Sequence, residues 1–297
     1  MSTEEISSRY ADLDEWPTHE AVAAILEDQS VAAAAVQAQT GAIAAAAEAS
    51  AERLREGAGR LIYVGAGTSG RLALLDGVEL GPTYDWSEDR LVFCLAGGSG
   101  ALRASVEGAE DDIAAAEAII ANTAAGPADV AIGVAASGRT PYTLAAIRAA
   151  AAAGALTIGI SNNAGTPLLA AAHHPIHLDT GLEIVAGSTR MKAGTAQKIA
   201  LTTLSTAIML RLGRLYGGLM VDMRASNAKL RQRAIAMVCQ ISGADQPLAG
   251  AALERMGGSI KLAALSALGA EPENAIALLK QAHGNLRHAI ARLELPV

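Results

Sequence analysis

The sequence predicts an α/β fold in three layers, with helices on both faces of a five-stranded parallel sheet, and a small all-helical region at its C-terminal end. Short apolar runs that end in small residues recur along residues 60–179 and alternate with alanine-rich helical stretches, a pattern typical of parallel strands joined by crossover helices. Beyond Gly217 and Gly218 the pattern is helical only. We therefore expect N-terminal helices over 1–57, an α/β domain over 58–222 and a helical region over 223–297.

Each predicted element follows from its local pattern. The N-terminal helices are expected over 21–27 and 31–56, the second ending at Gly57 and Gly59. The predicted strands are 60–66, 90–96, 129–136, 155–161 and a weaker 175–179. The predicted helices between and after them are near 70–80, 101–122, 141–153 and 191–215, then 222–241, 249–256, 259–268, 273–281 and 285–293.

Composition narrows the possible functions. The chain is 51% hydrophobic, but alanine dominates that count and no run of about 18 apolar residues occurs, so we predict no membrane span. The net charge of −7 and the lack of a basic stripe argue against nucleic-acid binding. Two isolated cysteines, Cys94 and Cys239, and an N-terminus without a signal peptide favour the cytoplasm. The scattered histidines and cysteines lack metal-ligand spacing, so we expect no metal and no cofactor.

Three loops at predicted strand ends pair small residues with hydroxyls just before a helix. Glycine lets an anion approach the backbone, and the start of a helix offers free N–H groups. Because ligands of parallel sheets bind beyond the carboxyl ends of the strands, these loops predict a site for a phosphorylated sugar. The predicted binding residues are Gly67, Thr68, Ser69 and Gly70, then Ser137, Gly138, Arg139 and Thr140, and finally Ser188, Thr189 and Lys192.

The first of these loops also matches the G-x-G-x-x-G fingerprint of dinucleotide sites. That fingerprint requires an acidic residue at the end of the second strand. Here the second predicted strand ends in Leu95-Ala96-Gly97-Gly98, so a dinucleotide site is disfavoured. Two carboxylates stand near the loops, Glu79 before Gly81-Pro82 and Glu110 in an acidic stretch. On sequence alone, Glu79 and Glu110 could equally be exposed carboxylates on the surface of a helix.

Four motifs together resemble the N-acetylmuramic acid 6-phosphate etherase family, which has the sugar isomerase (SIS) fold and is related to glucokinase regulatory proteins. They are Gly65-Ala-Gly-Thr-Ser-Gly-Arg71, Val106-Glu-Gly-Ala-Glu-Asp111, Ala136-Ser-Gly-Arg-Thr-Pro-Tyr142 and the long Gly187-Ser-Thr-Arg-Met-Lys-Ala-Gly-Thr-Ala-Gln-Lys198. The resemblance covers nearly the whole chain. From about residue 240 it includes a tail similar to a ubiquitin-associated three-helix module, with Ala282-His-Gly-Asn-Leu-Arg-His-Ala-Ile290.

The resemblance implies a carbon–oxygen lyase that converts N-acetylmuramic acid 6-phosphate into N-acetylglucosamine 6-phosphate and D-lactate, a step of peptidoglycan recycling. It implies that Glu79 and Glu110 are the catalytic carboxylates. The chain departs from the family pattern at Leu80-Gly81, at Leu182 and around Ser7 to Tyr10, where an Asn is expected. An isomerase of the same fold and a non-catalytic sugar-phosphate sensor are the rival interpretations.

The chemistry suggests how the two carboxylates divide the work. We expect Glu110 to remove the C2 proton of the open-chain sugar and Glu79 to protonate the leaving ether oxygen. The ten residues from Ser69 to Glu79 span about 15 Å of helix, which is too far for one sugar phosphate to bridge easily. Glu79 is therefore expected to meet a phosphate bound elsewhere, on residues 137–140 or on a second subunit, which predicts a homodimer with its site near the interface.

Overall fold

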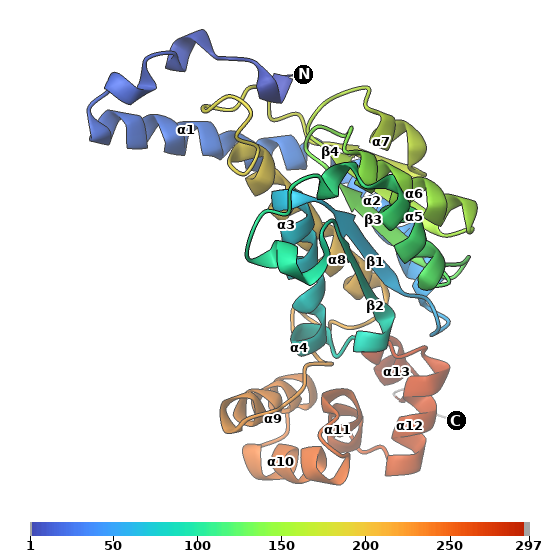
Figure 1. The fold of residues 1–297 in the computed structure, drawn as a ribbon. Coiled ribbons are helices and arrows are strands. Elements are labelled where there is room, and N and C mark those ends of the chain that lie inside the picture. Colours follow the sequence, from blue (N-terminus) through green and yellow to red (C-terminus); the bar gives the residue numbers. More distant parts are fainter. Residues whose placement is uncertain (1, 294–297) are drawn as a thin grey trace. The chain divides into compact units, whose positions relative to one another are not determined.

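The computed structural model describes residues 2–293, which form two compact units. The first runs to Val78 and resumes over Asp89–Ala207, and the second comprises Glu79–Glu88 together with the chain from Ile208 onwards. The sheet belongs to the first unit, whereas the second is built from helices (Figure 1).

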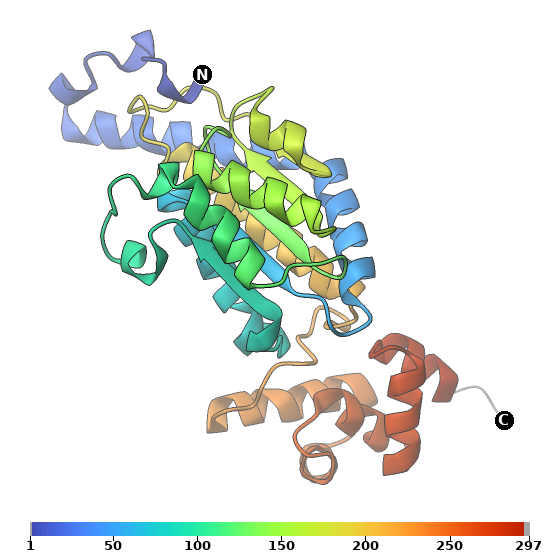
Figure 2. The same cartoon turned by 45° about the vertical axis from the view of Figure 1, so that its right-hand side comes forward.

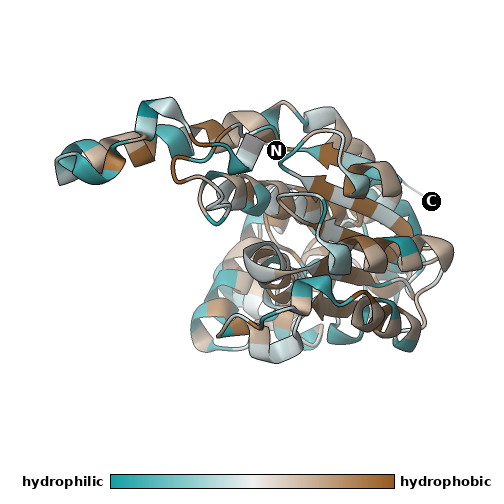
Figure 3. Ribbon diagram, turned by 45° about the horizontal axis from the view of Figure 1, so that its top comes forward, coloured by the Kyte–Doolittle hydropathy of each residue, from teal (hydrophilic) through white to brown (hydrophobic). Residues whose placement is uncertain are grey.

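Five parallel strands form the sheet of the first unit, in the spatial order β2-β1-β3-β4-β5. They are β1 (Leu61–Gly65), β2 (Leu91–Leu95), β3 (Val130–Val134), β4 (Leu156–Ser161) and β5 (His174–His177). All residues of β1, β3 and β4 are buried, as expected for a parallel sheet covered on both faces, and hydrophobic colouring runs along the sheet (Figure 3). The predicted five-stranded fold is confirmed, with bounds that shift by one or two residues.

Helices cover both faces of the sheet, which gives three layers. One face carries α5 (Ile113–Asn122), α6 (Pro141–Ala152) and α7 (Pro167–Ala171), and the other carries α2 (Thr40–Leu54) and α3 (Gly67–Val78). The long α8 (Lys192–Arg211) runs beside α2 and α3 behind the sheet (Figures 1 and 2). An apolar cluster fills the space under α5 and α6, where Ile62 and Val64 of β1 meet Ile147 of α6.

The N-terminal helices differ from the prediction. A first helix, α1 (Thr18–Gln37), continues through residues 28–30, where a break was expected, and the break lies instead at Ala38 and Gln39 before α2. Ser30 lies within this helix, and its hydroxyl donates to the Glu27 carbonyl one turn earlier. Among the described residues no single helix is long and apolar enough to cross a membrane, although α1 and α2 reach that length and composition together across a 55° bend.

The segment 97–112, which follows β2, is also different. A helix was predicted from residue 101, but α5 begins only at Ile113, where the Asp112 side chain caps it by accepting the Ala115 N–H. Before it the chain makes two short 3₁₀ turns, Gly98–Leu102 and Ala109–Asp111. Glu110 therefore lies on an irregular segment and not within a helix.

The second unit is a set of helices, and its C-terminal series packs around one apolar cluster. They are α4 (Leu80–Tyr84), α9 (Ala228–Ser242), α10 (Gln246–Arg255), α11 (Ile260–Ala267), α12 (Pro272–Gln281) and α13 (Leu286–Leu293). The side chains of Asn227, Asp245 and Ser259 cap the first three helices of the C-terminal series. The predicted helices of this region are confirmed, with α9 starting later than expected because Asn227 caps it.

The junction of β1 and α3 depends on two glycines. A Cβ on Gly70 would lie 2.6 Å from the backbone carbonyl of Gly65 and 2.5 Å from a methyl group of Leu95. A Cβ on Gly65 would lie 2.7 Å from the Cα of Gly70. Real Cβ atoms do not approach other atoms so closely, so the helix can start against the end of the strand only when both positions are glycine.

We predict that Gly70→Ala lowers the free energy of unfolding by about 1–3 kcal/mol, because the added methyl group forces backbone apart in a packed region. Gly41→Ala is the matched control, since a Cβ there meets nothing within 4 Å and alanine suits the interior of α2. Urea denaturation of the two variants checks this. Equal stability of both variants would contradict the close approach.

Candidate functional site

The first predicted loop forms the start of α3. The helix begins at Gly67, which has a positive φ of 53°, and the Gly70 N–H already donates to the Ala66 carbonyl. The N–H groups of the preceding residues therefore lie in the first turn of a helix, which is a favourable place for an anion. Ser69 and Gly70 are buried, Thr68 is half-buried and Gly67 is exposed.

A cavity of about 260 Å³ lies beside this helix start. One wall is formed by Ala66, Gly67 and Arg71. The rest is formed by the segment after β2, through Ala96, Ala101 and residues 105–110. The structure therefore brings two sequence-predicted site residues, Gly67 and Glu110, to one cavity at the carboxyl edge of the sheet.

The carboxylates of this cavity face a largely open environment. Glu107 and Glu110 both line it and both are exposed. A second cavity of about 500 Å³ adjoins the same segment, sharing residues 106–109 with the first. Its inner wall includes Tyr142, whose pKa burial raises to about 12. The segment that carries Glu110 thus has open space on two sides.

The loop after β3 is tightly packed at its glycine. Gly138 has a positive φ of 61°, and a Cβ there would lie 2.3 Å from the Thr166 hydroxyl and 2.5 Å from that of Ser161. The Ser137 hydroxyl accepts the Arg139 N–H at 3.2 Å. Arg139 is exposed and Thr140 is half-buried at the start of α6. Gly138 therefore packs against the end of β4 and the start of α7, while the hydroxyl-bearing residues Ser137 and Thr140 remain partly exposed.

The third predicted loop meets the first one at α8. A Cβ on Gly194 would lie 3.1 Å from the Thr189 carbonyl oxygen and 3.6 Å from the Thr68 methyl carbon, so these residues converge on the first turn of that helix. Ser188 and Thr189 are half-buried in a turn in which the Ser188 N–H donates to Val185.

Lys192 has a different environment from the other predicted ligands. Its ammonium lies 2.5 Å from Asp28 Oδ1 and 2.6 Å from the Leu182 carbonyl oxygen, and its side chain is only 5% exposed. Its charge is thus neutralised by α1, and its role in substrate binding stays a prediction. The ion pair ties α1 to the start of α8.

Glu183 is a buried carboxylate that no sequence motif singled out. Its two oxygens accept the backbone N–H groups of Lys192 at 3.0 Å and Ala193 at 2.8 Å, and the side chain is fully buried. Burial raises the pKa of Glu183, while these two N–H groups and the Lys192 charge act in the opposite direction. The carboxylate caps α8 from outside the helix, and only the tertiary structure shows the pairing.

Glu79 belongs to the second unit. It is exposed and lies at the residue before α4, where its carbonyl accepts the Thr83 N–H. Its side chain makes no capping hydrogen bond. The carboxylate is thus open to solvent at the junction that follows α3.

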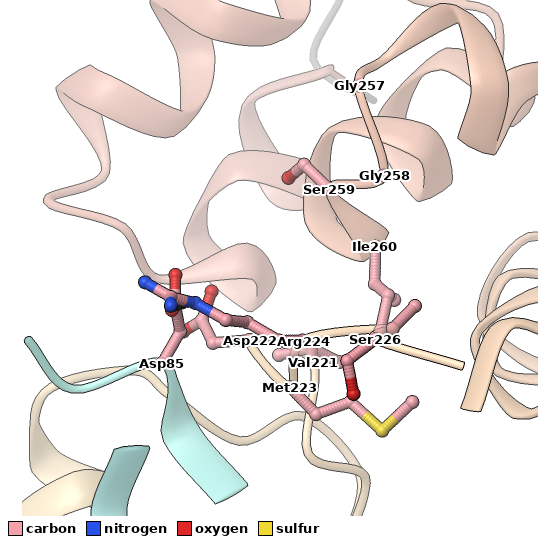
Figure 4. A pocket seen from close by; sticks show the side chains of 11 residues that line it. Asp85, Val221, Asp222, Met223, Arg224, Ser226, Gly257, Gly258, Ser259 and Ile260 are labelled. Carbon is pink, nitrogen blue, oxygen red and sulfur yellow. Dashed lines mark hydrogen bonds and ion pairs between the residues drawn. The ribbon is translucent and has the colours of Figure 1, made fainter. Parts of the chain in front are cut away.

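A cavity of about 410 Å³ lies within the second unit, between the 221–226 segment and the start of α11 (Figure 4). Its charged side chains are paired. Arg224 pairs with Asp85, and Asp222 lies 2.5 Å from the buried ammonium of Lys261 and 3.6 Å from Arg214. Burial raises the pKa of Asp222 and lowers that of Lys261. The cavity therefore offers few free charges to a ligand.

No group of three or more His, Cys, Asp or Glu side chains in the part of the chain that the structure describes could hold a metal ion. Cys94 is buried in β2, and burial raises its pKa to about 12, so this thiol is not a ready nucleophile.

Two family models and a solved structure are similar to parts of this chain. A family model described as the N-terminal SIS domain of glucokinase regulatory protein matches residues 42–151, and one described as the SIS domain matches residues 109–207. Among solved structures, a phosphoheptose isomerase from Francisella tularensis is similar with a TM-score of 0.47 and 16% identity, over 66% of this chain and 98% of that chain.

Curated relatives are similar over nearly their whole length. A protein of Deinococcus radiodurans named N-acetylmuramic acid 6-phosphate etherase is 53% identical, over 98% of this chain and 96% of its own. Proteins with the same name from Rubrobacter xylanophilus and Streptomyces avermitilis are 46% and 44% identical, covering 98% and 94% of their own lengths.

We predict that Lys192→Met lowers the free energy of unfolding by about 3–5 kcal/mol, because it leaves the Asp28 carboxylate buried without its cation. Lys198→Met, on the same helix but with its ammonium in an exposed hydrogen bond to Thr202, is the control and is expected to change stability by about 0.5 kcal/mol or less. Thermal and urea denaturation measure both. An effect of Lys192→Met as small as that of the control would show that the pair contributes little.

Proposed function

The chain belongs to the family of N-acetylmuramic acid 6-phosphate etherases, and we propose that Glu110 is the base with which it cleaves the D-lactyl ether of that sugar phosphate. The observation that carries the proposal is the position of Glu110, in a cavity that also contains the start of α3. A carboxylate there can reach a sugar whose anionic groups lie against helix N–H groups and loop hydroxyls.

The reaction proceeds by elimination and then addition. In the open-chain sugar the C2 proton is acidic because the C1 aldehyde stabilises the carbanion. Glu110 removes this proton, and the C3–O bond breaks as the ether oxygen takes a proton from an acid, which yields an unsaturated aldehyde and D-lactate. Water then adds its oxygen to C3, a proton returns to C2, and N-acetylglucosamine 6-phosphate results. The first half is a carbon–oxygen lyase reaction.

The proposed acid is Glu79. One carboxyl group must be ionised and the other protonated at the same time, which two residues in different surroundings can achieve. From Ser69 to Glu79 the chain spans about 15 Å of helix, so the sugar phosphate that meets Glu79 is expected to be bound by another loop or another subunit. We therefore propose a homodimer whose site lies near the subunit interface.

The phosphate is proposed to lie against the hydroxyl-rich loops. Thr68 and Thr189 converge at the start of α8. The hydroxyls proposed to donate to the phosphate with them are those of Ser69, Ser137, Thr140 and Ser188. Backbone N–H groups at the start of α3 add to them, together with Gly70, Gly138 and Arg139. Hydroxyls and amides suit a phosphate ester without requiring a cluster of basic residues.

The proposal also covers the domain organisation, the cellular location and the cofactor requirement of the enzyme. The segments 1–57, 58–222 and 223–297 are proposed as the functional parts of the chain, the last with a three-helix tail. The enzyme is proposed to act in the cytoplasm, where sugar phosphates of cell-wall recycling are metabolised. It is proposed to act without metal or nucleotide, because the two carboxylates supply the required proton transfers.

We expect Glu110→Gln to lose about 10²- to 10⁴-fold in kcat for lactate release and to lose exchange of the C2 proton with solvent. Glu79→Gln is expected to lose lactate release by a similar factor but to keep C2 exchange. Lactate release and deuterium uptake at C2 are measured side by side, and Glu117→Gln, an exposed glutamate of α5, serves as the control.

Two outcomes would count against this assignment. If Glu79→Gln also lost C2 exchange, the division between base and acid would be wrong. If the unaltered chain bound the sugar phosphate but released no lactate, the chain would act as a sensor or an isomerase.

A further inference from the structure

Arg71 is the one cationic side chain among the described residues that line the cavity of Glu110. Its Nε donates to the Ala101 carbonyl oxygen at 2.8 Å and its Nη2 to that of Ala104 at 3.4 Å. Arg71 is half-buried as a residue. Of the five N–H groups of its guanidinium, these two bonds use the one on Nε and one on Nη2. The side chain is thus fixed against the wall of the cavity by two carbonyls while N–H groups remain free.

The cavity otherwise has a negative character. Glu107 and Glu110 both line it, and no other charged side chain balances them among the described lining residues. An anionic ligand group that enters such a cavity is repelled by the carboxylates unless a cation lies close to it. Arg71 is the group that can supply this charge.

The substrate of the proposed function carries a second anion besides its phosphate. The lactyl carboxylate is separated from the ether oxygen by a single carbon, so it lies close to C3 and to the C2 proton that Glu110 removes. The phosphate is at C6, at the other end of the sugar. A substrate whose C2 faces Glu110 therefore places its lactyl carboxylate in the same cavity.

We propose that Arg71 is a specificity-determining residue that binds the lactyl carboxylate. Arginine presents parallel N–H groups in a rigid fork that matches a carboxylate, and the bonds to Ala101 and Ala104 fix the plane of that fork in advance. The inference rests on the proposed etherase activity. It adds that the Arg71 guanidinium recognises the lactyl group, which is the part of the substrate that leaves.

The test compares N-acetylmuramic acid 6-phosphate with its lactyl amide, which has nearly the same shape and no charge at that position. The unaltered enzyme is expected to prefer the acid by about 10- to 100-fold in kcat/KM, the range of a charge-assisted hydrogen-bonded pair. Arg71→Gln keeps a hydrogen-bond donor for the carbonyls but removes the charge, so its preference is expected to fall to within about 3-fold of unity. Arg103→Gln, an exposed arginine of the same segment, is expected to keep the preference.

A purely structural role for Arg71 would lower kcat/KM for both substrates by the same factor, and that result would overturn the inference. Arg71→Lys gives an independent answer should Arg71→Gln not fold. Lysine keeps the charge and loses the fork, so the preference should fall several-fold, and an unchanged preference would count against the inference. If the unaltered chain released neither lactate from the acid nor lactamide from the amide, that result would instead refute the proposed function.

Discussion

The end of β1 and the first turn of α3 meet backbone to backbone, because neither Gly65 nor Gly70 carries a side chain. This contact sets the direction in which α3 leaves the sheet, and therefore where its free N–H groups lie. Arg71 follows Gly70 at once, so the same contact directs its guanidinium toward the segment after β2. The start of α3 and the direction of the Arg71 side chain toward the Glu110 segment therefore both depend on the absence of a Cβ at Gly65 and Gly70.

The segment that carries Glu110 contains only two short 3₁₀ turns between β2 and α5. Its fixed points are few: Asp112 caps α5, Arg71 binds two of its carbonyls, and Gly97 packs closely on Val106. Between these points the chain borders two cavities. If Glu110 is the base, as proposed, its segment can adjust to the substrate while the ends of the segment remain in place.

The strands and most helices were predictable, because buried parallel strands are continuous apolar runs and the helices are rich in alanine. The segment 97–112 was not, since Ala104 and the alanines beyond it have high helix propensity while Arg71, which binds this segment, is distant in the sequence. The predicted break at residues 28–30 failed for a related reason, because Asp28 is buried within α1 against Lys192. The spacing of glycines and hydroxyls predicted which loops would follow the strands, but nothing in the sequence singled out Glu183, since its partners are backbone amides.

A chain with a net charge of −7 must bind a substrate that carries two anionic groups. Clusters of lysine and arginine are absent from the described lining of the site, so the attraction has to be local. Amides at a helix start and hydroxyls on the three predicted loops can bind the phosphate without a net positive field. In the proposed site the lactyl group differs, because its carboxylate lies beside the proposed base Glu110, and there the proposed contact with Arg71 distinguishes the substrate from the product. Discrimination by one charge in a small cavity fits an enzyme whose product differs from its substrate by the lactyl group alone.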